Sequence, residues 1–385
     1  MRILFDHQVF SWQSYGGISR YFAEQLRGLK ALGQEAMLPD GFFSENVYLR
    51  EFPEFNRQSL TSFHFKGKKP LQNLLGRHAS TKAIRSKNPD VFHPTYFDTY
   101  FLKTIENRGV PFVLTVHDMI HELYGHGQRC LFSLDAQVIK NKPILAKKSA
   151  AIIAVSENTR RDLLHYYPEI DPAKIHVIYH GNSVASDSLT LSETITQSET
   201  ITLPYLLFVG QRKFYKNFSW MVKQIADLLH SEKDLHLLCV GGSGFDSFET
   251  GLFKQLGISH KVLYKTVRSD LELANVYRKA LCFIFPSQYE GFGIPVLEAF
   301  ACGCPVVLNR ASSLPEVGGT AASYFDEEDP DSLVTAVRRV LGDADFREKM
   351  IGLGRERVQL FTWQQSANKH LAVYQAVVNQ CTSAP

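Results

Sequence analysis

Short apolar runs alternate with amphipathic segments along most of the chain. Runs rich in Val, Ile, Leu and Phe predict strands at residues 2–9, 91–95, 111–118, 150–156 and 175–181. A second series follows at residues 204–211, 235–242, 261–267, 281–286, 305–309 and 323–326. Because helical patterns separate these runs, we expect parallel sheets covered by helices, and the fold class is α/β.

A stretch rich in Ser and Thr, "SVASDSLTLSETITQSETIT", separates the two series of strands and predicts a linker or a long surface loop. We expect a doubly wound, Rossmann-like domain on each side of it, with the two domains facing each other across a cleft. The predicted parts are a first domain at 1–183, a linker at 184–203, a second domain at 204–365 and a helix at 366–385 that can cross back to the first domain.

The composition is that of a soluble globular protein, with 44% hydrophobic and 21% charged residues among 385. No apolar run approaches the ~18–20 residues of a membrane span, and the first residues, "MRILFDHQVF", lack the layout of a signal peptide. We therefore expect a cytoplasmic protein. The cysteines show neither a CxxC pair nor the Cys/His spacing of a zinc site, so we predict that their thiols are buried and reduced. They are Cys130, Cys239, Cys282, Cys302, Cys304 and Cys381.

Residues 57–87 contain eight Lys or Arg residues and neither Asp nor Glu, with Phe and Leu residues interleaved. One interpretation is the solvated face of a helix. The other is a surface for an anionic membrane or an anionic acceptor. Nucleic acid is not expected as a partner, because the rest of the chain is not basic and the net charge is only +3.

Two features of the first half lie where predicted strands end. Gly16 and Gly17 follow the first strand and open a helix, so their N–H groups can meet an anion, although a tight turn explains the pair equally well. His117 and Asp118 end the strand at 111–118, where a histidine is either structural or directed into a ligand site. Both features are candidates because ligands bind at the carboxyl ends of strands in doubly wound folds.

In the second half, "FVGQRKFYKN" places Arg212, Lys213 and Lys216 between a strand and a helix. A fixed guanidinium fork and a mobile ammonium beside a helix N-terminus suit a diphosphate, and solvated loop charges are the alternative.

Two carboxylates, Glu290 and Glu298, flank the glycines of "EGFGIPVLE". Gly291 and Gly293 let the backbone approach a ligand, and Pro295 fits the first turn of a helix. We expect Glu298 in that first turn, on the same side as Glu290. The pair could then accept hydrogen bonds from the vicinal hydroxyls of a sugar or ribose, and two solvated glutamates are the alternative.

The pattern "EGFGIPVLE", followed by "GCPVV" and "SSLPEVGG", resembles the retaining GT-B glycosyltransferases of family 4, also called group 1. The segments "YGGISRYF", "TVHD", "AVSENTRRDL" and "FVGQRKFYKNF" match in the same order, so the resemblance covers nearly the whole chain. The segment "YGGISRY" together with R-x3-KN is similar to bacterial enzymes that build O-antigen, capsule or exopolysaccharide, many of them mannosyltransferases.

The resemblance implies a role for each candidate residue of the second domain. Arg212 and Lys216 would hold the diphosphate of the donor and stabilise the departing nucleotide. Glu298 would bind the ribose hydroxyls, and Glu290 would contact the transferred sugar.

The same resemblance completes the site with backbone groups and with residues of the first domain. The backbone of Phe292 and Gly293 would lie beside the sugar, and His117 would hydrogen-bond to it. The Gly16–Gly17 turn would approach the phosphates. Gln211 stands where many relatives have Arg, and Arg212 follows it.

Two D-x-D matches, Asp329–Asp331 and Asp343–Asp345, precede helical patterns in which Asp is an ordinary cap, so no metal site is predicted. Two cations would stabilise charge instead. No cofactor is expected beside the donor substrate, for which the resemblance favours GDP-mannose and allows a UDP-sugar.

The resulting hypothesis is a metal-independent retaining hexosyltransferase with mannose as the favoured sugar. The acceptor would be a growing surface polysaccharide or a lipid-linked glycan, reached from the cytoplasm or at the inner face of the cytoplasmic membrane. A GT-B sugar-nucleotide epimerase and a non-catalytic nucleotide-sugar-binding subunit are the alternatives. A nicotinamide-dependent oxidoreductase is disfavoured, because the dinucleotide glycine fingerprint is absent after the first strand of both halves.

Overall fold

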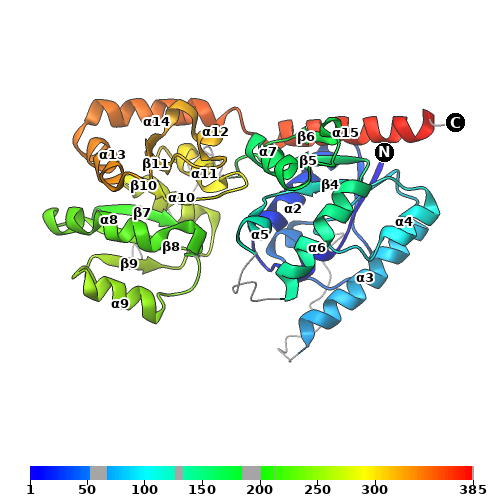
Figure 1. The fold of residues 1–385 in the computed structure, drawn as a ribbon, viewed down its shortest axis with the longest axis horizontal. Helices are drawn as coiled ribbons and strands as arrows, with labels where there is room; N and C mark the ends of the chain where they lie inside the picture. Colours follow the sequence, from blue (N-terminus) through cyan, green and yellow to red (C-terminus); the bar gives the residue numbers. More distant parts are fainter. Residues whose placement is uncertain (53–66, 126–132, 184–200, 213, 384–385) are drawn as a thin grey trace. The chain divides into compact units, whose positions relative to one another are not determined.

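The computed structural model describes residues 1–52, 67–125, 133–183, 201–212 and 214–383. Its contacts divide the chain into two compact units, one formed by residues 1–181 and 363–385 and the other by residues 182–362 (Figure 1). The described residues exclude several positions singled out in the sequence: Cys130, Lys213, residues 57–66 of the basic stretch and residues 184–200 of the expected linker.

The first unit contains two parallel three-stranded sheets, ordered β2-β1-β3 and β4-β5-β6, which a bridge between Phe92 and Phe112 connects. Its strands are β1 (Arg2–Phe5), β2 (Glu35–Met37), β3 (Val91–His93), β4 (Val113–Val116), β5 (Ala151–Ala154) and β6 (Ile175–Val177). Its helices are α1 (Gln8–Trp12), α2 (Gly17–Ala31), η1 (Val47–Glu51), α3 (Lys68–Ser86), α4 (Leu102–Arg108), α5 (Ile120–Tyr124), α6 (Ser133–Lys148), α7 (Glu157–Tyr166), η3 (Pro172–Lys174) and α15 (Trp363–Ser383).

The second unit is built on one parallel six-stranded sheet in the order β12-β11-β10-β7-β8-β9. Its strands are β7 (Tyr205–Val209), β8 (His236–Val240), β9 (Val262–Lys265), β10 (Cys282–Phe285), β11 (Val306–Asn309) and β12 (Ser323–Phe325). Its helices are η6 (Phe214–Lys216), α8 (Phe218–Ser231), α9 (Ser247–Gln255), α10 (Asp270–Lys279), α11 (Ile294–Ala301), α12 (Leu314–Gly318), η7 (Gly319–Ala321), α13 (Pro330–Gly342) and α14 (Ala344–Val358).

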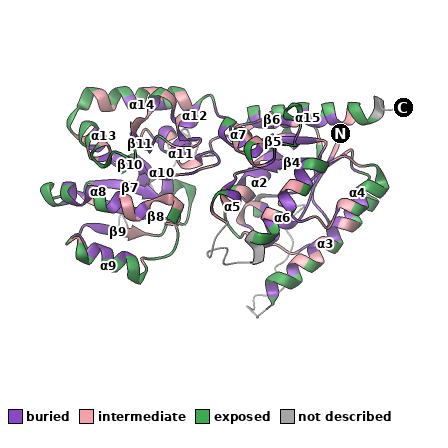
Figure 2. Ribbon diagram, viewed as in Figure 1, coloured by how far each residue is buried: buried purple, intermediate pink, exposed green. Residues whose placement is uncertain are grey.

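The strand order of the second sheet reverses between β7 and β10. These two strands pair directly, with Cys282 beside Leu206, while β8 and β9 extend the sheet on one side and β11 and β12 on the other. The strands are largely buried beneath helices whose outer faces are exposed (Figure 2). The predicted α/β fold with doubly wound parallel sheets is confirmed, and the reversal is the position at which such sheets bind ligands.

One local prediction was wrong. The strand predicted at 2–9 ends at Phe5, because the Asp6 carboxylate accepts hydrogen bonds from the N–H groups of Gln8 (3.2 Å) and Thr95 (2.9 Å), and helix α1 follows. A reciprocal capping box heads α9: the Asp246 carboxylate accepts from the Glu249 N–H at 2.8 Å, and the Glu249 carboxylate from the Asp246 N–H at 2.9 Å.

A chain of buried hydrogen bonds holds helix α15 against the rest of the first unit. The Tyr374 hydroxyl lies 2.6 Å from His93 Nδ1, and His93 Nε2 lies 3.0 Å from Thr115 Oγ1. Thr115 Oγ1 is also 3.0 Å from the Tyr21 hydroxyl, which is 2.6 Å from His370 Nε2. The chain therefore connects α15 to α2, β3 and β4.

Only one arrangement of protons satisfies this chain. His370 Nδ1 must donate to the Ser366 carbonyl, 2.7 Å away, and burial lowers the pKa of His370 to about 4, so the neutral ring accepts at Nε2. Tyr21 then donates to His370, Thr115 donates to Tyr21, and His93 donates to Thr115. The Tyr374 hydroxyl donates to His93 Nδ1, and every polar hydrogen of the chain has an acceptor.

The first unit should lose stability as the pH falls through 6.5, the ordinary histidine value, because the unfolded chain then binds protons that buried His370 does not. Between pH 7.5 and 5.5 this single group should remove about 1 kcal/mol from the free energy of unfolding. Urea denaturation at both pH values will measure the loss, and His370→Gln should reduce it by that amount. His78→Gln, at an exposed position, is the control and should leave the loss unchanged; an equal effect of the two substitutions would contradict the prediction.

Candidate active site

The clearest constellation in the second unit lies at the carboxyl ends of β7 and β10, where the strand order reverses. The Lys216 ammonium, at the end of η6, is 2.5 Å from the Glu290 carboxylate in the loop after β10. Both side chains are largely buried, with 15% and 12% of their surfaces exposed. The tertiary structure thus joins a cation and an acid that are 74 residues apart in the chain.

Two aromatic rings also lie close to the Lys216 ammonium. The nitrogen lies 5.3 Å from the ring centre of Phe285, the last residue of β10, and 5.4 Å from that of Tyr215. Such rings stabilise a cation while keeping water away from it. A second ligand of this ammonium would therefore feel its charge strongly.

Hydrogen bonds to the loop after β11 fix the backbone around Glu290. The Glu290 N–H donates to Ser312 Oγ at 2.9 Å. Ser313 Oγ lies 2.9 Å from the Glu290 carbonyl and 2.8 Å from the Phe292 carbonyl. Sequence reasoning gave the two serines no role, although they belong to the segment "SSLPEVGG". They hold the Glu290 loop in one conformation.

Glu298 is placed differently from the expectation. Helix α11 begins at Ile294 after Gly293, whose φ of 117° favours glycine, so Glu298 falls in the second turn rather than the first. It is 6% exposed, and its carboxylate accepts a hydrogen bond from the Tyr277 hydroxyl at 3.1 Å. Burial and the neighbouring carboxylate raise the pKa of Tyr277, which keeps this donor protonated.

Arg212 lies inside a hydrogen-bonded network of its own unit. Its Nε donates to the Glu249 carboxylate at 2.6 Å, and its Nη atoms donate to the carbonyls of Gly241 (3.2 Å), Ser243 (2.6 Å) and Gly244 (3.1 Å). The side chain is only 5% exposed. In this structure the guanidinium therefore supports the turn after β8, and its contact with a diphosphate stays a prediction.

Of the two candidates of the first unit, His117 directly follows β4, whereas helix α1 separates the Gly16–Gly17 turn from β1. Gly16 precedes α2, which begins at Gly17, and a Cβ on Gly16 would lie 2.5 Å from Gln13 Oε1. That oxygen accepts the Ser19 N–H at 3.2 Å, so Gln13 already occupies part of the helix N-terminus at which an anion was expected. A Cβ here would only displace the flexible end of the Gln13 side chain, and the φ of 168° is extended backbone that any residue adopts.

His117 follows β4 and is buried beside the chain that anchors α15. Its ring is edge-on to Tyr21, with ring centres 4.9 Å apart, and stacked on His180 at 6.0 Å. Burial lowers the pKa of His117 to about 4, so the ring is neutral. Within the described part of the chain its Nε2 has no hydrogen-bond partner, which leaves one polar atom able to bind a ligand.

The D-x-D segments are at helix starts, as the sequence indicated. Asp343 caps α14 by accepting the Phe346 N–H at 2.9 Å, and Asp329 occupies the cap position of α13. In the described ranges no group of three or more His, Cys, Asp and Glu side chains could hold a metal ion.

No helix of the described ranges is long and apolar enough to cross a membrane. Cys381 is exposed, contrary to the prediction of buried thiols. The other cysteines of the described residues are free and buried, as predicted: Cys239, Cys282, Cys302 and Cys304.

Two family models match successive parts of this chain. Residues 15–185 match Glycosyltransferase Family 4, and residues 192–357 match Glycosyl transferases group 1. The first match covers most of the first unit, and the second covers both the Lys216–Glu290 pair and the Arg212 network.

Relatives and solved structures agree with these matches. An uncharacterized glycosyltransferase MJ1607 of Methanocaldococcus jannaschii is 28% identical over 64% of this chain and 66% of its own length. O-antigen chain mannosyltransferase B of Escherichia coli is 32% identical over 44% and 45%. These matches thus span from under half to about two thirds of the relatives' own length.

The fold is also found in Alr3699/HepE of Anabaena, a structure in complex with UDP and glucose. It covers all of both chains with a TM-score of 0.69 at 14% identity. With a parallel α/β sheet arrangement in each unit and a family match to each half, the chain belongs to the group 1 glycosyltransferases of GT-B fold, with an N-terminal domain of the family 4 type.

Proposed function

We propose that this protein is a retaining glycosyltransferase that moves a hexose from a nucleoside-diphosphate sugar to a glycan acceptor. The observation that carries the proposal is the pairing of Lys216 with Glu290 at the reversal of the second sheet. A cation for a diphosphate and an acid for sugar hydroxyls stand together there, at the edge where doubly wound sheets bind nucleotides. The similarity to an Escherichia coli mannosyltransferase favours mannose, and therefore GDP-mannose, as the donor.

The ion pair suggests how donor binding prepares the site. A diphosphate competes with Glu290 for the Lys216 ammonium, and the partly dry, aromatic surroundings strengthen that attraction. Once Lys216 binds phosphate, the Glu290 carboxylate is released to accept hydrogen bonds from the sugar. In the first unit, His117 is neutral, and its Nε2 is unpartnered among the described residues, so this atom can donate or accept one hydrogen bond.

Transfer with retention needs no protein nucleophile in this scheme. The bond between the sugar C1 and the phosphate oxygen breaks, and its electron pair leaves with the nucleoside diphosphate. The acceptor hydroxyl attacks C1 from the same face, and its proton passes to the departing phosphate oxygen. Lys216 stabilises the negative charge that develops on that phosphate, which is electrostatic catalysis by a fixed cation.

Lys216→Ala should reduce turnover by about 10²-fold or more, the loss typical of one group that stabilises transition-state charge. Arg212→Ala should cause a comparable loss, whether the guanidinium contacts phosphate or supports the turn after β8. Transfer assays with a panel of nucleotide sugars will measure both, with exposed Lys223→Ala on α8 as the matched control. Activity should persist in EDTA, and a strict requirement for added manganese or magnesium would refute the metal-independent scheme.

Glu298→Ala should weaken binding of the free nucleoside diphosphate by about 1–3 kcal/mol, because ribose hydroxyls lose a charged acceptor. Glu290→Gln should lower turnover yet bind the nucleotide at least as tightly as the wild type, since it no longer competes for Lys216. Isothermal titration calorimetry with GDP and UDP separates the two effects. Tyr277→Phe, which keeps the Glu298 carboxylate, should weaken binding less than Glu298→Ala. Equal weakening by the Glu290 and Glu298 substitutions would disprove this division of roles.

We also propose that the first unit meets its acceptor at an anionic membrane surface through α3. The structure limits which charges can take part: Lys68, Arg77 and Lys87 pair with Glu45, Asp98 and Asp40. The exposed surface of α3 is then mostly apolar and basic, apart from Ser86; its exposed residues are Lys69, Pro70, Leu71, Leu74, His78, Lys82, Arg85 and Ser86.

The protein should sediment with anionic vesicles and not with neutral ones, and added salt should release it. Replacing Lys82 and Arg85 with Gln should weaken sedimentation about 30-fold, at about 1 kcal/mol for each charge, without affecting donor hydrolysis. Lys254→Gln with Lys279→Gln changes the charge equally on exposed helix positions of the second unit and is the control. Failure of the wild type to bind anionic vesicles at low salt would leave α3 as a solvated face.

A further inference from the structure

Three loops of the second unit meet at the edge where its parallel strands end, and one carboxylate connects them. Glu327 lies two residues after β12. Its Oε2 accepts hydrogen bonds from the side-chain amides of Asn217 at 2.8 Å and Gln288 at 3.1 Å. Asn217 follows β7 and Gln288 follows β10, at 110 and 39 positions from Glu327 in the chain, so only the fold brings the three side chains together.

Each of the two amides stands next to one member of the Lys216–Glu290 pair. Asn217 follows Lys216 directly, and Gln288 stands two residues before Glu290. In the described part of the chain, Glu327 has no hydrogen bond or ion pair with either member of that pair. Glu327 therefore connects the two segments that carry the cation and the acid of the candidate active site, and it reaches each of them through a neighbour.

The backbone at Asn217 shows why a side-chain partner matters at this position. Its φ of 55° and ψ of 26° lie in the left-handed region, which costs free energy for a residue other than glycine. Asn217 also occupies the N-cap position of α8, where Asn commonly accepts a hydrogen bond from the first turn, yet its side chain makes no such bond. The bond to Glu327 takes the place of the cap and stabilises the turn that directly follows Lys216.

The loop after β10 is joined to the loop after β7 at the same place. The Gln288 N–H donates to the Tyr215 carbonyl at 2.9 Å, while its side-chain amide donates to Glu327. Tyr215 directly precedes Lys216. A backbone hydrogen bond and a carboxylate bridge therefore hold together the two loops that carry Lys216 and Glu290.

The segment that carries Glu327 is itself fixed without its side chain. Ser332 Oγ accepts the Asp326 N–H at 3.0 Å, which closes the turn after β12. The Trp220 ring of α8 stacks on Phe325, the last residue of β12, with ring centres 5.6 Å apart. Since these contacts do not involve the Glu327 carboxylate, we expect a substitution of Glu327 to leave the fold intact.

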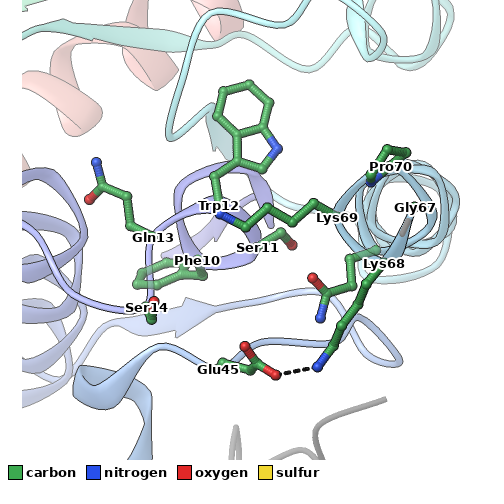
Figure 3. A pocket seen from close by; sticks show the side chains of 11 residues that line it. Phe10, Ser11, Trp12, Gln13, Ser14, Glu45, Gly67, Lys68, Lys69 and Pro70 are labelled. Atoms are coloured by element: carbon green, nitrogen blue, oxygen red, sulfur yellow. Dashed lines mark hydrogen bonds and ion pairs between the residues drawn. The ribbon is translucent and has the colours of Figure 1, made fainter. Parts of the chain in front are cut away.

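An ordinary ion pair does not account for Glu327. Figure 3 shows such a pair in the first unit, where the Lys68 ammonium turns to the Glu45 carboxylate, 2.5 Å away. Glu327 has no cationic partner within the described ranges and is bound by two neutral amides instead. Because both amides donate to one oxygen, which has two lone pairs, a neutral carbonyl oxygen in the same place can also accept both bonds. The contact therefore fixes geometry and does not require charge.

The bridge matters most once the donor is bound. In the proposed function, a diphosphate takes the Lys216 ammonium away from Glu290, and the direct contact between these two side chains is lost. The Glu327 bridge does not involve those side chains, so it remains and keeps the two loops at the same separation. A displacement of about 1 Å in groups of this kind can reduce a rate by about 10²-fold.

We propose that Glu327 is a positioning residue of this transferase, which holds Lys216 and Glu290 in place for the donor through Asn217 and Gln288. The role rests on the proposed function, in which the ammonium binds the diphosphate and the Glu290 carboxylate binds the sugar. Glu327 acts through the two amides rather than on the substrate. Turnover therefore requires an acceptor atom at the position of Oε2 and not a negative charge.

Transfer assays compare two substitutions at this position. Glu327→Ala removes the acceptor and should lower kcat about tenfold, because the Lys216 ammonium is still present but displaced. Glu327→Gln keeps a carbonyl oxygen for both amides, and its kcat should stay within about twofold of the wild type. Glu328→Ala, at the exposed next position, is the matched control and should not change kcat. Equal losses in Glu327→Ala and Glu327→Gln would overturn the proposal.

Calorimetry separates positioning from a general structural effect. Glu327→Ala should weaken binding of whichever of GDP and UDP the wild type binds by about fivefold, the scale of one net hydrogen bond. In a Lys216→Ala background the same substitution should change binding little, because no ammonium is left to position. Equal weakening in both backgrounds would reveal a structural defect and contradict the positioning role.

The two measurements also separate this proposal from the proposed function. If Glu327→Ala weakens nucleotide binding only when Lys216 is present, in a chain that transfers no sugar, the transferase is refuted and the positioning role is kept. If the chain is an active transferase whose kcat and nucleotide binding both ignore Glu327→Ala, the positioning role alone is refuted.

Discussion

The reversal of strand order between β7 and β10 is the constraint on which the candidate active site depends. All strands of this sheet run parallel, so every loop that follows the carboxyl end of a strand emerges at the same edge of the sheet. At the reversal, the two neighbouring loops lead to opposite sides of the sheet and leave room between them. Lys216 enters that room from β7 and Glu290 from β10, and the serines after β11 fix the second loop.

Pairing of charges within each unit decides which groups remain for ligands. Arg212 is engaged by Glu249 and three carbonyls, whereas among the described residues Lys216 has one hydrogen-bond acceptor, Glu290. On and just after α3, acids from other parts of the chain neutralise Lys68, Arg77 and Lys87, although residues 57–87 contain no acid. Replacing protein acceptors with a ligand therefore costs less free energy for Lys216, which has one acceptor to replace, than for Arg212, which has several.

Most elements of both units could be predicted from apolar periodicity, because buried parallel strands read as continuous apolar runs and the covering helices as amphipathic ones. Boundaries were less predictable, since side-chain hydrogen bonds set them: Asp6 ends β1 four residues into the run predicted at 2–9. The candidate site was predicted in part. Glu249, Ser312 and Ser313 were missed because a single carboxylate or hydroxyl in a loop is ordinary until its partner is known. The local signals for them were the capping pattern from Asp246 to Glu249 and the segment "SSLPEVGG" that contains both serines.

By itself, the sequence determined the α/β fold, the two-part organisation and the position of Lys216, Glu290 and His117 after predicted strands. These features follow from local rules, because periodicity and turn chemistry act over a few residues. The tertiary structure alone decided that Lys216 pairs with Glu290, that Arg212 turns to Glu249, and that α15 is tied to the first unit through Tyr21 and His370. Those contacts join residues 37 to 349 positions apart, and only packing brings such residues within hydrogen-bond distance.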